Sequence, residues 1–187
     1  MYLKKTNAFL GLLSAVALLV HMLYNCFAYF TFYYNPALKG WTSLPLIILV
    51  CAHAVCGMCA VFLMGDGTRL DLYPSGNRGT ITQRISAALL FPLLIVHLKT
   101  FELLNASSKE GKWFMFALLI IVQLLFYGVA VAHTAVSFSK GCVTLGLIGD
   151  EKKLKAVNGI IGTVFGLAFL AVSVAVIRGE ILMFVLM

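Results

Sequence analysis

Apolar residues occur along this chain in long runs that short polar segments separate. Each run is close to the ~20 residues with which a helix crosses the ~30 Å hydrocarbon core of a bilayer. The five runs lie at residues 9–30, 44–64, 81–101, 114–138 and 157–177. The pattern predicts an all-α membrane protein with five transmembrane helices in a bundle, residues 1–187 forming a single domain in a lipid bilayer.

The composition agrees with that prediction. Of the 187 residues, 61% are hydrophobic and only 11% are charged, so no length is left for a soluble domain. Chemistry on a water-soluble substrate would therefore need partner subunits. Lys4 and Lys5 resemble the start of a signal peptide. The run that follows them, however, exceeds an h-region of about 7–15 residues, so we expect a retained helix.

Lysine and arginine positions predict the orientation, because cytoplasmic loops are enriched in them. With the N-terminus in the cytoplasm, nine would lie on the inner side: Lys4, Lys5, Arg69, Arg78, Arg84, Lys140, Lys152, Lys153 and Lys155. Five would lie on the outer side: Lys39, Lys99, Lys109, Lys112 and Arg178. We therefore expect a multi-pass protein of the cell membrane with a cytoplasmic N-terminus. The net charge of +7 is a topology signal and indicates no nucleic-acid partner.

The four histidines are the main candidates for chemistry. His21, His53, His97 and His133 each fall in a different one of the first four runs. Ionisable residues in a bilayer are costly, and by default they face the bundle interior and serve a function. Interhelical hydrogen bonding is the structural alternative. A proton relay would want acids beside the histidines, whereas four neutral imidazoles fit the axial positions of two b-type haems.

The depth of each histidine predicts how they pair. At a rise of 1.5 Å per residue, His21 and His97 would lie roughly 18–20 Å and 24 Å above the inner ends of their helices. His53 and His133 would lie roughly 14 Å and 28 Å below the outer ends of theirs. We therefore expect His21 to share an outer haem with His97, and His53 to share an inner haem with His133.

A weak internal repeat supports the outer pair. It matches Asn7 with Gln83, Gly11 with Ala87, and His21 with His97. A step of fourteen residues moves roughly 21 Å along a helix and returns to within about 40° of the same face. Asn7 and Gln83 would therefore lie beneath the outer histidines, at the depth of the inner haem's propionates.

Other polar and small residues have less specific roles. Arg84 and Lys140 lie near the inner ends of histidine-bearing runs, where they would contact haem propionates or anchor the helices at the interface. The last run contains no histidine, so we expect it to pack structurally or to face lipid. Its three glycines have the spacing for close helix contact: Gly159, Gly162 and Gly166.

Four stretches, each containing one of the histidines, follow one another along the chain: GLLSAVALLVHM, CAHAVCGM, QRISAALLFPLLIVHL and AHTAVSFSKG. Together they resemble the four histidine helices of the dihaem cytochrome b subunit of succinate:quinone oxidoreductases. This is the complex II family of succinate dehydrogenases and fumarate reductases. The third stretch, with Gln83, Ser86 and His97, is similar to the family's Q-x-x-[ST]-G-x9-H helix, although Ala87 replaces the glycine.

The resemblance implies cofactors and partners. Ser86 would join Gln83 and the histidines at the haems. In the family, the anchor binds a flavoprotein with covalent FAD and an iron–sulfur protein on the cytoplasmic side, and quinone reacts in the membrane part. The chain would transfer electrons between quinone, with menaquinone favoured, and the iron–sulfur subunit. It has Val131 where some members have a glutamate, so the resemblance does not extend to the proton coupling linked to such acids.

An outer haem is useful only if quinone reacts near it. The polar candidates in that region are Asn25, Tyr34, Asn35 and Glu102. Glu102 is the one carboxylate among them that could accept a quinol proton, and we take it as the candidate catalytic residue. Its structural alternative is an interface charge near Lys99.

Two other functions stay open at this stage. The chain could anchor another quinone-linked oxidoreductase, such as a hydrogenase or a formate dehydrogenase. It could also be a small transporter or channel that uses the histidines as a relay. The visible absorption spectrum separates a channel from a cytochrome, and the co-purified hydrophilic subunits separate the two kinds of anchor.

Overall fold

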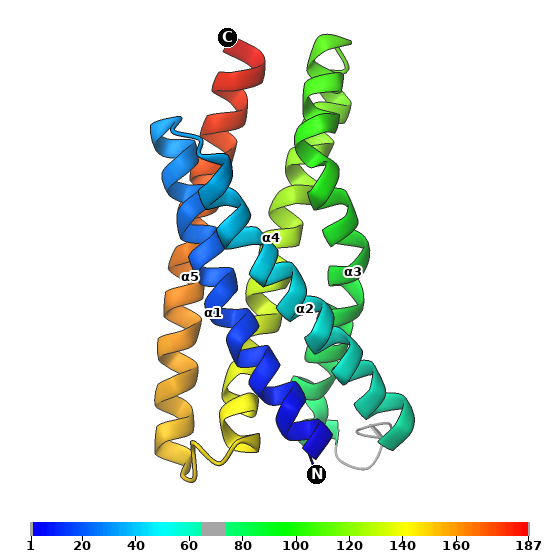
Figure 1. Ribbon diagram of the computed structural model, residues 1–187, viewed down its shortest axis with the longest axis vertical. Helices are drawn as coiled ribbons and strands as arrows, with labels where there is room; N and C mark the ends of the chain where they lie inside the picture. The colour runs from blue at the N-terminus through cyan, green and yellow to red at the C-terminus, as the bar shows by residue number, and fades with distance from the viewer. Residues whose placement is uncertain (1, 65–73, 187) are drawn as a thin grey trace.

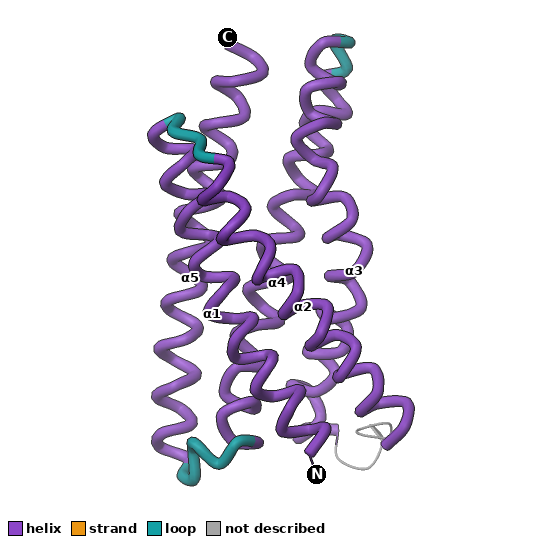
Figure 2. The backbone as a smooth tube through the Cα atoms, viewed as in Figure 1, coloured by secondary structure: helices purple, strands orange, loops and turns teal. Residues whose placement is uncertain are grey.

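The computed structural model describes residues 2–64 and 74–186, and the side chains of all of these except 64 and 74–78. Arg69 and the side chain of Arg78, both part of the predicted inner charge, lie outside the described residues. All secondary structure in the described part is helical (Figure 2). The helices are α1 (Tyr2–Thr31), α2 (Pro36–Met64), α3 (Pro74–Lys109), α4 (Trp113–Thr144) and α5 (Glu151–Ile181), followed by the π-helix η1 (Leu182–Leu186).

All five α-helices are long and apolar enough to span a membrane, which confirms the predicted class and number of helices. Each is longer than its apolar run because hydropathy marks only the part that crosses hydrocarbon, whereas backbone hydrogen bonding continues through polar residues. Local signals fix the starts. Pro36 and Pro74 occupy first-turn positions, where a missing N–H costs nothing. The Asp150 carboxylate caps α5 by accepting a hydrogen bond from the Lys153 amide at 2.7 Å.

The helices form a bundle with α1 packed against α2, α4 and α5, and with α3 packed against α4 (Figure 1). The N-terminus and the α4–α5 connection lie at one end of the bundle. The C-terminus and the α1–α2 and α3–α4 connections lie at the other. Five helix pairs stay apart within the described residues, with no Cα atoms approaching within 8 Å: α2 with α3, α4 and α5, and α3 with α1 and α5.

The buried core lies mainly where α5 meets α1 and α4. Met22, Val172 and Val176 form one apolar cluster there. A second cluster around Leu104 and Phe116 joins α3 to α4 and receives η1. The helix without histidine, α5, therefore packs structurally, which was one of its two predicted roles.

The glycine face of α5 does not take part in that packing. Within the described residues, a Cβ built at any of its three glycines would meet no heavy atom within 4 Å: Gly159, Gly162 and Gly166. Their spacing therefore serves no close helix contact inside this chain. The face is open, which agrees with the lipid-facing alternative.

Candidate cofactor site

Each of the four histidines is carried by a different helix, α1 to α4, and each is partly buried. His53 on α2 and His133 on α4 form the closer pair. Their ring centroids are 6.4 Å apart and the ring planes are inclined by 63°. The two helices that carry them do not pack on each other within the described residues, so the rings meet edge to face between separated backbones.

The second nitrogen of each ring is held by hydrogen bonds. His53 Nδ1 lies 3.0 Å from the backbone oxygen of Asn7. Because a carbonyl oxygen can only accept, Nδ1 of His53 carries the proton and donates it. His133 Nδ1 lies 2.9 Å from Ser86 Oγ and 3.2 Å from the backbone oxygen of Gln83. In neutral His53, Nε2 therefore carries no proton and is the nitrogen that could bind a metal. The oxygens beside Nδ1 of His133 can accept a proton from it, which favours the same tautomer in that ring.

Ser86 is placed so that its hydroxyl oxygen can accept from His133. The Ser86 side chain is buried, with 6% of its surface exposed. Its single proton has an acceptor 2.7 Å away on the backbone oxygen of Thr82, so the hydroxyl oxygen remains free to accept from Nδ1.

Two matched positions of the sequence repeat contact His53 and His133. Asn7 on α1 and Gln83 on α3, the matched positions of the repeat, each present a backbone oxygen to one histidine of the pair. Gly11 follows Asn7 by one turn and lies against the His53 ring, where a Cβ would stand 2.9 Å from Cε1. The small residue is therefore required by the imidazole of a neighbouring helix.

His97 and His21 are the predicted outer pair. The His97 ring stacks on Phe126 with centroids 4.6 Å apart, and its Nδ1 lies 2.8 Å from the carboxamide nitrogen of Gln123. His21 Nδ1 is buried and has no hydrogen-bond partner among the described residues. A buried polar nitrogen without a partner is costly, so a water molecule or another group would have to bond it.

Polar side chains gather beneath His53 and His133, toward the N-terminal end of α1. Lys140 Nζ donates to Thr80 Oγ1 at 3.3 Å and to Gln83 Oε1 at 3.5 Å. A Cβ on Gly79 would lie 3.2 Å from that ammonium, so the absence of a side chain at Gly79 leaves room for Lys140. Asn7 Oδ1 is buried without a partner in the described part of the chain, and Arg84 belongs to the same end of α3. This group has the charge and the donors that an acidic substituent of a cofactor would need.

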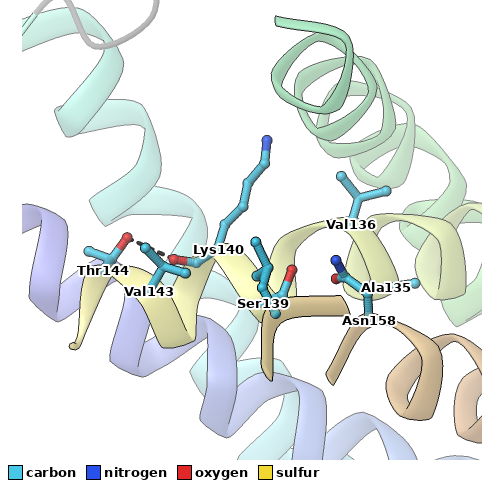
Figure 3. Close-up of a pocket in the computed structure, with 8 residues that line it drawn as sticks. Ala135, Val136, Ser139, Lys140, Val143, Thr144 and Asn158 are labelled. Carbon is cyan, nitrogen blue, oxygen red and sulfur yellow. Dashed lines mark hydrogen bonds between the residues drawn. The ribbon is translucent and has the colours of Figure 1, made fainter. Parts of the chain in front are cut away.

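A cavity of about 740 Å³ adjoins the polar group between α4 and α5 (Figure 3). Apolar side chains and three small polar ones line it, together with the stem of Lys140. In Figure 3 the lysine extends away from Ser139 and Asn158 rather than over them. Its ammonium is directed to Thr80 and Gln83 of α3.

A buried carboxyl group near the upper end of α5 was missed from the sequence. Glu180 is only 1% exposed, and Tyr29 donates its hydroxyl proton to Glu180 Oε1 at 3.3 Å. The other oxygen, Oε2, is buried and has no partner among the described residues. The sequence placed Glu180 just beyond the last apolar run, 157–177, where a solvated end is expected. Only the packing of α5 against α1 shows that it is enclosed.

The predicted outer candidates have local roles. Glu102 is exposed and pairs with Lys99 at 2.8 Å, the arrangement described by the structural alternative. Asn25 donates to the backbone oxygen of His21 at 2.8 Å. Asn35 Oδ1 accepts backbone N–H groups at the start of α2. Tyr34 is largely exposed. The structure does not gather these four side chains into one pocket.

Within the described residues, no group of three or more histidine, cysteine or acidic side chains could hold a bare metal ion. His53 and His133 meet as a pair of imidazoles. No family model, curated protein or solved structure matches the chain. The features of the chain that bear on function are therefore its five helices long enough to span a membrane and the geometry of its histidines.

Proposed function

We propose that this chain is the membrane anchor and dihaem cytochrome b subunit of a succinate dehydrogenase or fumarate reductase. It would transfer electrons between quinone and an iron–sulfur partner subunit. The supporting observation is the pairing of His53 with His133 across two helices that do not pack on each other, with a backbone acceptor for the Nδ1 proton of each ring.

The distance between these rings fits a shared metal. With metal–imidazole bonds of about 2.0 Å and about 1 Å more to each ring centre, two axial imidazoles have centroids about 6 Å apart. The observed separation is 6.4 Å. Direct packing of two histidines would need neither separated helices nor matched Nδ1 partners, so these residues fit the haem.

Within this proposal the four histidines hold two b-type haems, which supply one-electron transfer when bound. His53 and His133 hold the inner one, and His21 and His97 the outer one. Gln83, Ser86 and the Asn7 backbone orient the inner ligands. Lys140, Arg84 and the Asn7 side chain would receive the propionates, since an ammonium and a guanidinium stabilise carboxylates at the membrane interface.

The decisive experiment is the haem content of the purified chain in detergent. We expect close to two b-type haems per chain by the pyridine haemochrome assay, with low-spin spectra that carbon monoxide does not change. A chain that carries no haem when produced with an ample haem supply would refute the proposal and favour a relay or channel.

The partners and the cytoplasmic orientation belong to the same proposal. A flavoprotein with covalent FAD and an iron–sulfur protein should co-purify with the tagged chain in gentle detergent. If subunits of a hydrogenase or formate dehydrogenase co-purify instead, the chain would still be a cytochrome b, but it would belong to a different enzyme complex. Succinate:quinone or quinol:fumarate activity, measured with menaquinone analogues, then identifies the direction.

We further propose that quinone reacts near the outer pair and that Glu102 accepts the quinol proton there. A carboxylate at the membrane surface can pass a proton to water, which is what quinol oxidation requires. Glu102→Gln should keep both haems and the partners but slow quinol turnover, while dye-linked activity of the flavoprotein stays normal. Unchanged quinol turnover would contradict this role, and Glu102 would then serve only in its surface ion pair with Lys99.

A further inference from the structure

Gln123 on α4 is a buried side chain with three side-chain partners, one of them His97. It is 5% exposed. One end of its carboxamide lies 2.8 Å from His97 Nδ1 and 2.5 Å from the Tyr127 hydroxyl. The other end lies 3.1 Å from Thr100 Oγ1. Three side chains from two helices thus converge on a single amide.

The count of protons around this amide decides which end faces His97. If the nitrogen faced His97, the Thr100 hydroxyl would have to supply both Gln123 Oε1 and its own backbone acceptor, the Val96 oxygen at 2.9 Å. A hydroxyl has one proton, so one of these two bonds would be missing. With the oxygen toward His97, the amide N–H donates to Thr100 and the Thr100 hydroxyl donates to Val96.

The second orientation also satisfies the remaining partners. Oε1 then accepts from Tyr127 O–H and from His97 Nδ1–H, and all four bonds have one proton each. This arrangement protonates His97 at Nδ1 and leaves Nε2 as the nitrogen with a free lone pair. It is the tautomer that a metal-binding imidazole needs.

The two histidine pairs differ in what holds them. His53 is held by a backbone oxygen, and His133 by a backbone oxygen together with Ser86. Substituting a side chain therefore leaves a carbonyl acceptor at each of these rings. His97 is held by a side chain, and His21 Nδ1 has no partner in the described residues. Among the four histidines, all of which the structure describes, His97 is the one whose Nδ1 partner is a side chain alone.

We propose that Gln123 is a positioning residue that fixes the Nδ1–H tautomer of His97 and tunes the outer haem through it. This inference rests on the proposed haem function. An acceptor at Nδ1 raises the basicity of the coordinating nitrogen, and loss of such a partner typically changes metal affinity 10–100-fold. A more basic ligand favours oxidised iron, so removal of the acceptor should raise the reduction potential of the outer haem.

The test compares Gln123→Leu and Gln123→Glu by redox titration of the purified chain, followed by visible spectra and by electron paramagnetic resonance. The outer haem is identified as the component that His97→Ala removes. Gln123→Leu should raise its midpoint by about 59 mV or more, a tenfold change in a one-electron equilibrium. Gln123→Glu keeps an acceptor of greater strength and should lower the midpoint. Ser43→Ala on α2 is the control, since its hydroxyl donates to the Lys39 backbone oxygen of its own helix and both midpoints should stay in place.

Each outcome decides the inference. An outer midpoint that neither variant moves, or that both variants move in the same direction, would overturn it. If Gln123→Leu does not accumulate as a folded chain, the glutamate variant decides alone: a lower midpoint supports the inference, and an unchanged or raised one overturns it. A wild-type chain without haem would instead refute the proposed function. Two haems in the wild type with unmoved midpoints in the variants would refute only the role of Gln123.

Discussion

The imidazole of His53 packs against Gly11 of the neighbouring helix so closely that a Cβ on the glycine would stand 2.9 Å from Cε1 and 3.3 Å from Nδ1. One turn earlier, the backbone oxygen of Asn7 accepts the Nδ1 proton of the same ring. A single turn of α1 therefore fixes both the position and the rotation of the His53 imidazole, and no residue with a side chain fits at Gly11 unless the ring moves.

Gly11→Ala should therefore displace His53 and impair the inner site. Overpacking of this kind costs about 1–3 kcal/mol. We expect a loss of roughly half the haem together with a lower melting temperature in detergent. Gly162→Ala is the control, because a Cβ there meets nothing within 4 Å in the described residues and alanine favours a helix by about 1 kcal/mol. Equal haem content in both variants would show that the ring can move freely.

Substitution of single histidines should remove haems one at a time. His97→Ala is expected to remove the outer haem and largely to spare the inner one, and His133→Ala to do the reverse, because the pairs lie on different helices. Each variant should retain about one haem per chain, and the absorption spectrum of the remaining haem should differ between the two variants. Equal loss of both haems in a well-folded His97→Ala chain would contradict the pairing.

The orientation can be tested with cysteine probes at exposed positions of opposite ends. Lys109→Cys, near the end of α3, should react with an impermeant thiol reagent added to intact cells, whereas Lys153→Cys at the start of α5 should not. The reason is the excess of lysine and arginine on the side that carries Lys153. The unsubstituted chain supplies the background from its five native cysteines. The reverse labelling pattern would exchange the inner and outer assignments.

The pair of Glu180 and Tyr29 should respond oppositely to two conservative changes. Tyr29→Phe removes the hydroxyl that bonds the buried carboxyl group, and an unsatisfied buried group costs about 1–3 kcal/mol, so the melting temperature should fall. Glu180→Gln keeps an acceptor for Tyr29 and removes any burial of charge, so it should be neutral or stabilising. A greater loss of stability in the glutamine variant than in the phenylalanine variant would contradict this account.

The five helices could be predicted because each must hide its backbone from hydrocarbon, and the resulting runs are visible without any knowledge of neighbours. The ends could not, since α3 continues through polar residues such as Lys109 that hydropathy assigns to a loop. The repeat placed Asn7 and Gln83 at one level. It did not show that their backbone oxygens, rather than their side chains alone, reach the histidines.

Gln123 and Glu180 show where sequence reasoning ends. Both are single polar residues in or beside apolar runs, and their burial depends on which helix packs against them. Gln123 matters through its contact with His97 on α3, and Glu180 through its contact with Tyr29 on α1. Helix periodicity gives the face of a residue on its own helix but not the identity of the helix opposite.

The separation of α2 from α3 and α4 bears on how the protein is made. A helix that touches only one neighbour in the described bundle contributes little to a cooperative fold until something bridges it to the opposite side. A ligand that binds only the closed bundle stabilises it by mass action. In cells starved of haem biosynthesis, we therefore expect newly inserted chains to stay open at α2 and to be removed by membrane proteases, so that the amount of mature protein follows the supply of the cofactor.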